Sequence, residues 1–332
     1  MDMNNLSSVN QYDNIPDGLP KNFTREAFRI FNTQYAQNEL FRQFANSFHI
    51  HPEMIPGLEK IPFLPISFFK TQAVKTGSFV PEIIFESSGT TGQLASHHEV
   101  ASISLYRESF MRGFELFYGS VTDYCIIGLL PAYLERSGSS LVFMVDELIR
   151  QSNHKQSGFY LYAFDMLHEL LLELEKKKQK SLLIGASFAL LDFAEKFPML
   201  LQHTLVMETG GMKGRREEIT RAQLHETLMQ RLGVKEIHSE YGMTELLSQA
   251  YSKGNGIYQP VPWMKAMIRK EDDPLDVQLT GEGLLNIIDL ANRDSCAFVA
   301  TDDLAKVYPD GSFEVIGRMD NSDLRGCSLL TI

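Results

Sequence analysis

The segment of this chain best suited to chemistry is a glycine-rich loop that reads Ser-Ser-Gly-Thr-Thr-Gly. It follows the apolar run Val80 to Phe85, so we expect a strand that opens directly into the loop. Glycines let a backbone turn sharply and present its N–H groups, and an array of such groups binds anions. The hydroxyls add neutral donors that can follow a phosphate. The loop consists of Ser87, Ser88, Gly89, Thr90, Thr91 and Gly92.

The loop matches neither of the two best-known phosphate-binding patterns. A Walker A loop needs Lys and then Ser or Thr after its second glycine, but Gln93 and Leu94 follow Gly92 here. A dinucleotide fingerprint needs Gly-x-Gly-x-x-Gly at the start of a helix, which this stretch lacks. Most glycine-rich loops are only turns, so the interpretation depends on other segments of the chain.

Three later regions also combine glycines with hydroxyl, acidic or basic side chains. In an open α/β sheet, ligands bind at the carboxyl ends of the strands, and two of these regions follow an apolar strand pattern directly. Taken singly, each also fits an ordinary strand end, an exposed turn or a solvated loop. The regions are Glu208 to Lys213, Glu240 to Glu245, and Thr301 to Leu304 with the later Gly317 to Asp320 and Asp323 to Gly326.

Apolar strand patterns alternate with helical patterns through the middle of the chain, which predicts an α/β fold with a largely parallel sheet. Apolar spacing from Phe23 to Phe48 predicts amphipathic helices, and the proline-broken run Ile61 to Ile66 predicts a packed connector. Short strand patterns and turn residues from Val277 onward predict a small β subdomain. The expected strands are Tyr124–Leu130, Ser181–Ala186, Thr204–Glu208 and Glu236–Glu240, and the expected helices are Ser102–Tyr118, Phe164–Lys178 and Arg216–Leu232.

Composition narrows the class of protein. The chain has 332 residues, 44% of them hydrophobic, which is enough for a sizeable core. A formal charge of −11 argues against a general binder of nucleic acid or membrane surfaces. We find no signal peptide pattern and no apolar run long enough to cross a membrane. Three scattered cysteines, Cys125, Cys296 and Cys327, fit reduced thiols in a cytoplasmic protein.

Taken together, the four regions resemble the adenylate-forming superfamily, whose members make acyl-adenylates from a carboxylic acid and ATP. The glycine-rich loop, the Tyr-Gly-Met-Thr-Glu motif, the Thr-Asp-Asp element and the Gly-Arg-x-Asp hinge follow the order of that superfamily over residues 60 to 332. Within it, the chain is most similar to the acyl-protein synthetases of bacterial luminescence fatty-acid reductases, and next to phenylacetate–CoA ligases. The resemblance implies an N-terminal arm with helices (1–60), an adenylate-forming core of parallel-sheet subdomains (61–316), and a hinge with a truncated C-terminal segment (317–332).

For the reacting phosphates, the resemblance implies that the loop donors and the hydroxyls of Ser88, Thr90 and Thr91 hold the phosphates of ATP. Thr244 would donate to the α-phosphate, and Glu245 would hold Mg²⁺, a hard cation that prefers carboxylate and phosphate oxygens. Both reacting groups are anions, so such a site must neutralise charge and align the reactants.

For the nucleoside, the resemblance implies that Tyr241 stacks on adenine, while Gly210 and Gly211 form a flat backbone wall beside the base. Asp303 would accept the two ribose hydroxyls, and Arg318 would support the ribose. The expected nucleotide-binding set is completed by Ser87, Gly89, Gly92, Glu240 and Gly242.

The chain departs from the superfamily pattern at two places. The lysine that usually follows the loop is missing, and Lys213 is our candidate replacement, although a surface role for it is about as plausible. Members usually continue past the hinge into a small lid domain with a second lysine, which we expect to be absent or vestigial here. The luminescence synthetases are similarly short and carry their acyl group on a cysteine near the C-terminus, the place that Cys327 occupies.

Three functions remain open at this point. In the first, Cys327 attacks the acyl-adenylate and passes the acyl group to an acyl reductase or a carrier protein, whereas a small unreactive cysteine is the ordinary alternative. In the second, coenzyme A is the acceptor, as in a carboxylate–CoA ligase. In the third, the missing lysines mark a non-catalytic nucleotide-binding protein. We expect an apolar acid pocket around Leu129 to Phe143, with His97 or His98 near the carboxylate or merely packed.

Overall fold

The computed structural model describes residues 22–87, 94–131, 137–210 and 219–319. Within these ranges, thirteen strands form one continuous sheet whose character changes along its length. Part of the sheet is parallel, as expected where helical crossovers connect the strands. In spatial order, this part consists of β8 (His238–Tyr241), β7 (Thr204–Thr209), β6 (Ser181–Ala186), β4 (Cys125–Leu129) and β5 (Gly158–Phe159).

The rest of the sheet is antiparallel and continues from β8 without a break. One exception is β1 (Leu64–Pro65), which pairs parallel to β14. In spatial order, the antiparallel part consists of β9 (Ala250–Ser252), β10 (Ile257–Pro260), β15 (Phe313–Arg318), β14 (Phe298–Val307), β13 (Gly281–Asp289), β11 (Met264–Arg269) and β12 (Val277–Gln278).

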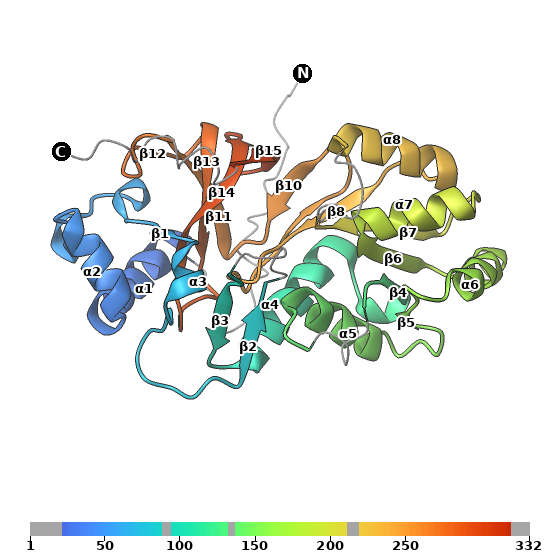
Figure 1. Ribbon diagram of the computed structural model, residues 1–332, viewed down its shortest axis with the longest axis horizontal. Coiled ribbons are helices and arrows are strands. Elements are labelled where there is room, and N and C mark those ends of the chain that lie inside the picture. Colours follow the sequence, from blue (N-terminus) through green and yellow to red (C-terminus); the bar gives the residue numbers. More distant parts are fainter. Residues whose placement is uncertain (1–21, 88–93, 132–136, 211–218, 320–332) are drawn as a thin grey trace, which may run out of the picture.

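Helices cover both faces of the parallel part (Figure 1). On one face lie α4 (Ile103–Tyr118) and α5 (Ser140–Ser152), and on the other α7 (Ser187–Lys196) and α8 (Arg221–Leu232). α6 (Phe164–Lys176) lies at the β5 end, while α1 (Phe23–Gln37), α2 (Glu39–Ser47) and α3 (Phe68–Thr71) lie beside the antiparallel part. Short 3₁₀ turns span Pro52–Met54, Leu58–Lys60 and Val121–Asp123.

A separate hairpin carries the glycine-rich loop. β2 (Ile83–Glu86) and β3 (His97–Val100) pair antiparallel, and the chain between them contains the loop. Phe85 is fully buried and packs edge-on against Tyr106 of α4 at 5.2 Å between ring centroids. The root of the loop is therefore fixed to the helical layer by an aromatic contact.

Sequence composition explains why the parallel strands form where they do. Every residue of β4 and of β6 is buried, and both strands read as near-continuous apolar runs. That pattern is typical of parallel strands covered by helices on both faces. These strands form the centre of the hydrophobic core, which extends without interruption into the antiparallel part.

The predicted α/β class is confirmed, and three boundaries differ from expectation. The helix expected from Arg216 begins at Arg221, because Thr220 and Gln223 form a capping box that fixes its first turn. The last parallel strand begins at His238, two residues later than expected. The β-rich part begins at Ala250, ahead of Val277, and its strands reach nine and ten residues.

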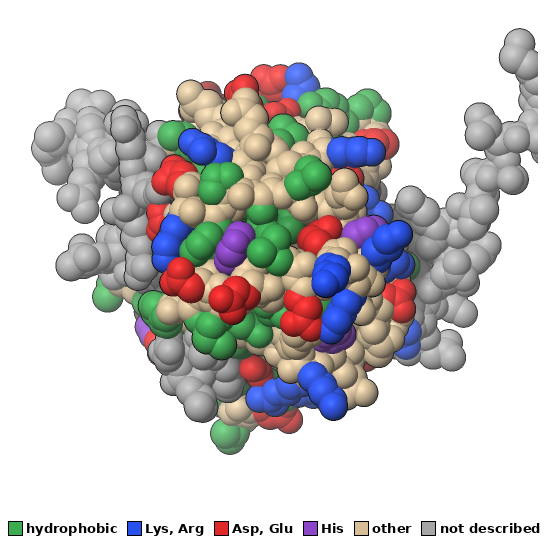
Figure 2. Space-filling model, turned by 90° about the vertical axis from the view of Figure 1, so that its right-hand side faces the viewer, with side chains coloured by type: hydrophobic (Ala, Val, Ile, Leu, Met, Phe, Trp, Pro, Cys, Tyr) green, Lys and Arg blue, Asp and Glu red, His purple; other side chains and the backbone are tan. Residues whose placement is uncertain are grey.

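The end of the molecule that carries α6 shows hydrophobic, acidic and basic side chains interspersed (Figure 2). This face has no uniform basic patch of the kind that nucleic-acid binders carry. Among the helices in the described ranges, none is long and apolar enough to cross a membrane.

Candidate functional site

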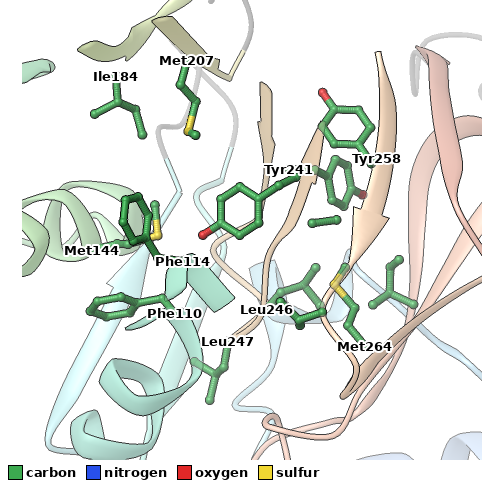
Figure 3. Close-up of a cluster of buried hydrophobic side chains, with 14 of the residues drawn as sticks. Phe110, Phe114, Met144, Ile184, Met207, Tyr241, Leu246, Leu247, Tyr258 and Met264 are labelled. Atoms are coloured by element: carbon green, nitrogen blue, oxygen red, sulfur yellow. The ribbon is translucent and has the colours of Figure 1, made fainter. Parts of the chain in front are cut away.

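Tyr241 connects the two parts of the sheet. It ends β8, and its hydroxyl donates to Asp303 Oδ2 in β14 at 2.8 Å. Its ring packs edge-on against Tyr258 and Phe313 at 5.7 and 5.2 Å between centroids, and Figure 3 shows it beside Tyr258. Three strands separate β8 from β14 in the sheet order, so the contact requires the sheet to curve strongly here.

Asp303 lies between a hydroxyl donor and a cation. Arg318 pairs with it across β14 and β15, with 3.9 Å between Arg318 Nε and Asp303 Oδ1. Burial raises the pKa of Asp303, while the Tyr241 hydroxyl and the positive charge of Arg318 lower it. Burial and the nearby carboxylate raise the pKa of Tyr241 well above its usual value. The tyrosine hydroxyl therefore stays protonated and remains a donor.

Two serines close the neck of the glycine-rich loop. The Ser87 N–H donates to the Ser96 carbonyl at 3.0 Å, and the Ser96 N–H donates to Ser87 Oγ at 2.8 Å. The predicted phosphate-binding residues Ser88 to Gly92 lie outside the described residues. Ser87 itself is occupied in holding the loop ends together, and its predicted role in ATP binding stays a prediction.

The segment after Tyr241 approaches this neck. Glu245 is 4% exposed, and burial raises its pKa, against the Ser96 hydroxyl and the charges of Arg318 and Lys70, which lower it. The charge of Arg318 thus acts on both Glu245 and Asp303. Glu245 and Asp303, expected to hold Mg²⁺ and ribose respectively, are thus two carboxyl groups whose pKa the same arginine lowers.

Asp289 fixes the backbone that follows the motif. Its carboxylate accepts the N–H groups of Leu247 and Ser248 at 2.8 and 3.0 Å, the Ser248 hydroxyl at 2.5 Å, and the Ala291 N–H at 3.1 Å. Burial raises the pKa of Asp289 to about 6 in spite of these donors. The turn after Glu245 is therefore held by a fully buried carboxyl group from β13.

Glu240 points into the core beneath the site. Thr209 Oγ1 donates to its Oε2 at 2.5 Å, and burial raises the pKa of Glu240 to about 7. A Cβ on Gly242 would lie 2.4 Å from Glu240 Oε1, so a side chain there would have to displace this carboxyl group. The Gln249 side chain lies on the same side, and its buried Oε1 has no hydrogen-bond partner among the described residues.

The second expected region is described only up to Gly210. Gly210 has φ +67°, and its carbonyl accepts the Ser187 hydroxyl at 2.7 Å. The left-handed φ favours glycine at this position, where the chain leaves β7. The predicted wall residue Gly211 and the candidate cation Lys213 lie outside the described residues.

The cysteines divide as follows. Cys125 and Cys296 are fully buried, and burial raises the pKa of these thiols to about 11 and about 12. Both are core residues, and such thiols are poor nucleophiles near neutral pH. Cys327 lies outside the described residues, so its predicted acyl-carrying role stays a prediction.

Three residues that the sequence interpretation did not assign belong to this site. Two of them, Asp289 and Ser96, lie outside the four regions that the sequence singled out. The third is Lys70, which lies on α3. No sequence spacing brings α3 to Glu245; only the fold does.

We compared the chain with known proteins. No protein-family model matches, and no curated protein matches. Among solved structures, a 2-hydroxyisobutyryl-CoA ligase in complex with 2-HIB-AMP, in the postadenylation state, matches 90% of this chain and 67% of its own at 12% identity, with a TM-score of 0.63. The chain has the fold of the N-terminal domain of adenylate-forming enzymes.

Two further structures share this fold. ATP-bound MatB from Rhodopseudomonas palustris matches 73% of the chain at 15% identity with a TM-score of 0.53. The O-succinylbenzoate coenzyme A synthetase MenE from Bacillus subtilis, in complex with ATP and magnesium, matches 71% at 15% identity with a TM-score of 0.50. The chain spans about half the length of each of these two proteins, 49% in both cases.

Proposed function

We propose that this chain activates a carboxylic acid with ATP to form an acyl-adenylate and pyrophosphate. The supporting observation is that Tyr241 donates to Asp303 beside Arg318, with Glu245 buried in the same motif as Tyr241, on a fold shared with ATP-bound MatB. In this proposal Asp303 accepts the ribose hydroxyls, Arg318 lies beside the sugar, and Tyr241 holds the carboxylate of Asp303 in place while its ring faces the base.

The chemistry follows from charge and geometry. A carboxylate oxygen of the acid attacks the α-phosphorus, the bond from that phosphorus to the bridging oxygen breaks, and pyrophosphate leaves. Thr244 donates to an α-phosphate oxygen, and the loop donors hold the outer phosphates. Lys70 is a described cation near Glu245, which makes it a second candidate, beside Lys213, for the missing loop lysine. Fixed donors of this kind stabilise the charge that builds up in the transition state.

Magnesium fits this site only together with the nucleotide. Among the described residues there is no group of three or more His, Cys, Asp or Glu side chains that could hold a metal ion. Glu245 would therefore supply one carboxylate, with phosphate oxygens and water completing the shell, as is usual for Mg²⁺. Magnesium bound there would neutralise phosphate charge.

The acid is expected to have an apolar body. Phe110, Phe114 and Met144 gather on one side of the buried cluster that also contains Tyr241 and Leu246 (Figure 3). These side chains come from α4 and α5, the layer that also holds the root of the glycine-rich loop. An apolar acid, a fatty acid first of all, could extend from the α-phosphate into this layer.

For the second half-reaction we propose transfer of the acyl group to a thiol. In an acyl-protein synthetase, the Cys327 thiolate attacks the acyl carbonyl, AMP leaves, and the thioester passes to an acyl reductase or carrier. The alternative acceptor is coenzyme A, which is favoured by the fold shared with 2-hydroxyisobutyryl-CoA ligase. Cys327 separates the two, because only the first route requires it.

Acid-dependent ATP–pyrophosphate exchange tests the first step, using fatty, short-chain and aryl acids in turn. Exchange that depends on one class of acid supports the proposal and identifies that class. Binding of Mg·ATP without exchange for any acid would reject it and leave a nucleotide-binding protein. Labelling with a radioactive acid, in wild type and Cys327→Ser, then tests the thiol route. A hydroxylamine-sensitive adduct in the wild type alone supports acyl transfer to Cys327, and exchange without an adduct favours coenzyme A.

A further inference from the structure

His98 links the glycine-rich loop to the proposed phosphate-binding motif. It lies on β3, the strand that leaves the loop, and it is fully buried, whereas the neighbouring His97 is exposed and faces Glu86. His98 Nδ1 lies 2.8 Å from the carbonyl oxygen of Thr244. His98 Nε2 lies 2.8 Å from Ser295 Oγ, on the far side of the ring.

The tautomer of His98 follows from its partners. A carbonyl oxygen can only accept, so Nδ1 carries the proton and donates to Thr244. Burial lowers the pKa of His98 to about 4, so the ring is neutral near pH 7 and Nε2 is an acceptor. The Phe69 ring packs edge-on against the imidazole at 5.6 Å between centroids.

The two sides of the ring are unequal. Ser295 Oγ lies 2.8 Å from His98 Nε2 and also 2.5 Å from Asn292 Oδ1, while Asn292 Nδ2 donates to the Glu245 carbonyl at 2.7 Å. The single proton of the Ser295 hydroxyl therefore has two possible acceptors, His98 Nε2 and Asn292 Oδ1, and it bonds to one of them at a time. The Nδ1 contact with Thr244 has no such competition and is the stronger of the two.

Ser96 provides a second connection between the same two segments. It precedes His98 by two residues, so both side chains point to the same face of the extended chain. Its N–H holds Ser87 at the loop neck, and its hydroxyl faces Glu245. A shift of β3 would therefore move the loop neck, Thr244 and Glu245 together.

We infer that His98 is a positioning residue for the adenylation step: its Nδ1–H holds the Thr244 backbone so that the loop and the motif act on ATP as one unit. The inference rests on the proposed function, in which Thr244 donates to the α-phosphate. A displaced donor would cost more in the transition state than in the bound ground state, because charge builds up on that phosphate as the bond forms.

Two substitutions separate the two sides of the ring. The amide nitrogen of His98→Asn can take the place of Nδ1 and keep the donor to Thr244, whereas the amide of His98→Gln takes the place of Nε2 and loses it. We expect H98Q to lower kcat for ATP–pyrophosphate exchange about 30-fold, weaken Mg·ATP binding only about threefold, and leave H98N within about threefold of wild type. Ser295→Ala and His97→Asn are the matched controls and should also stay within about threefold.

Thermal unfolding of each variant checks that the difference in kcat between H98N and H98Q does not come from a difference in stability. Equal losses of kcat in H98N and H98Q, or a loss of kcat in S295A as large as in H98Q, would overturn the inference. If wild type shows no exchange with any acid, the proposed function fails by itself. Mg·ATP affinity then decides the inference: weaker binding in H98Q alone supports it, and equal affinities in H98Q and H98N reject it.

Discussion

The parallel and antiparallel parts of the sheet contribute different things to the proposed site. The parallel part ends at Tyr241, after strands that are buried on both faces. The antiparallel part contributes Asp303 from the interior of the ten-residue β14 and Arg318 from the end of the six-residue β15. β9 and β10, which connect the two parts, have only three and four residues. The site therefore belongs to neither part alone, because it forms where the sheet bends between them.

Strand ends alone do not define this proposed site. Ligands of open α/β sheets bind at the carboxyl ends of parallel strands, which accounts for Tyr241 and for Gly210. It does not account for Asp303. This residue lies inside β14, on the face of the strand whose side chains point toward the site.

Removal of the Asp303 carboxylate should have the largest effect. In Asp303→Ala we expect Mg·ATP affinity to fall about 1000-fold, because two hydrogen bonds to a charged group, roughly 1.5–3 kcal/mol each, are lost. Asp302→Ala is the matched control, since the neighbouring side chain alternates to the other face of β14. Calorimetric titration measures both. A comparable loss of Mg·ATP affinity in the two variants would mean that β14 supports the site only by its structure and not through the Asp303 carboxylate.

Replacement of Glu240 should change stability in a pH-dependent way. Its raised pKa means that the folded state holds the proton more tightly than the unfolded chain, so wild type loses stability as pH rises from about 4.5 to about 7. Glu240→Gln cannot titrate and can still accept from Thr209. We expect the unfolding free energy of Glu240→Gln to exceed that of wild type by a margin that grows over this pH range and reaches on the order of 3 kcal/mol. Urea unfolding at several pH values measures it, and a pH-independent difference would contradict the assignment.

Removal of the Tyr241 hydroxyl alone should have a smaller effect. Tyr241→Phe keeps the ring packing against Phe313 but leaves Asp303 without its donor, so we expect Mg·ATP affinity to fall about tenfold. Tyr258→Phe removes a hydroxyl from the adjacent ring of the same aromatic cluster and should change affinity less than about threefold. Equal effects of the two changes would assign Tyr241 a packing role only.

Removal of the Arg318 side chain should have the smallest effect on Mg·ATP binding. Its side chain is 62% exposed and lies 3.9 Å from Asp303, and exposed ion pairs contribute roughly 0–1 kcal/mol. Arg318→Ala should therefore weaken Mg·ATP binding about fivefold at low salt, with a smaller difference at high salt, where such pairs are screened. Titrations at the two salt concentrations measure this. A loss as large as that of Asp303→Ala would show that the arginine contacts the nucleotide directly.

Four of the five parallel strands could be predicted from sequence to within about two residues, and in β4 and β6 burial on both faces leaves a continuous apolar run. The fifth, β5, was missed, because its two half-buried residues show no such run. The strands of the antiparallel part were harder to predict from the sequence. These strands share no single burial pattern, since β14 alternates over its second half while β13 is mostly buried, and Ala250 to Pro260 is too short and irregular to show a period. The β-rich part was accordingly expected only from Val277.

The order of the motifs pointed to Tyr241 and Asp303 as candidate site residues, and their roles stay predictions. The hydrogen bond between them depends on the bend in the sheet, which no local pattern encodes. The link from His98 to Thr244 likewise joins residues 146 positions apart. Long-range pairs of this kind are set by how the elements pack, so only the folded chain reveals them.

The central claim is that both parts of the sheet hold one nucleotide through Tyr241 and Asp303. A double-mutant cycle of Mg·ATP binding, by calorimetry on wild type, Tyr241→Phe, Asp303→Ala and the double variant, tests it most directly. We predict that Tyr241→Phe costs about tenfold in the wild-type background and less than about twofold once Asp303 is absent. The same loss in both backgrounds, or no Mg·ATP binding by the wild-type protein, would contradict the claim.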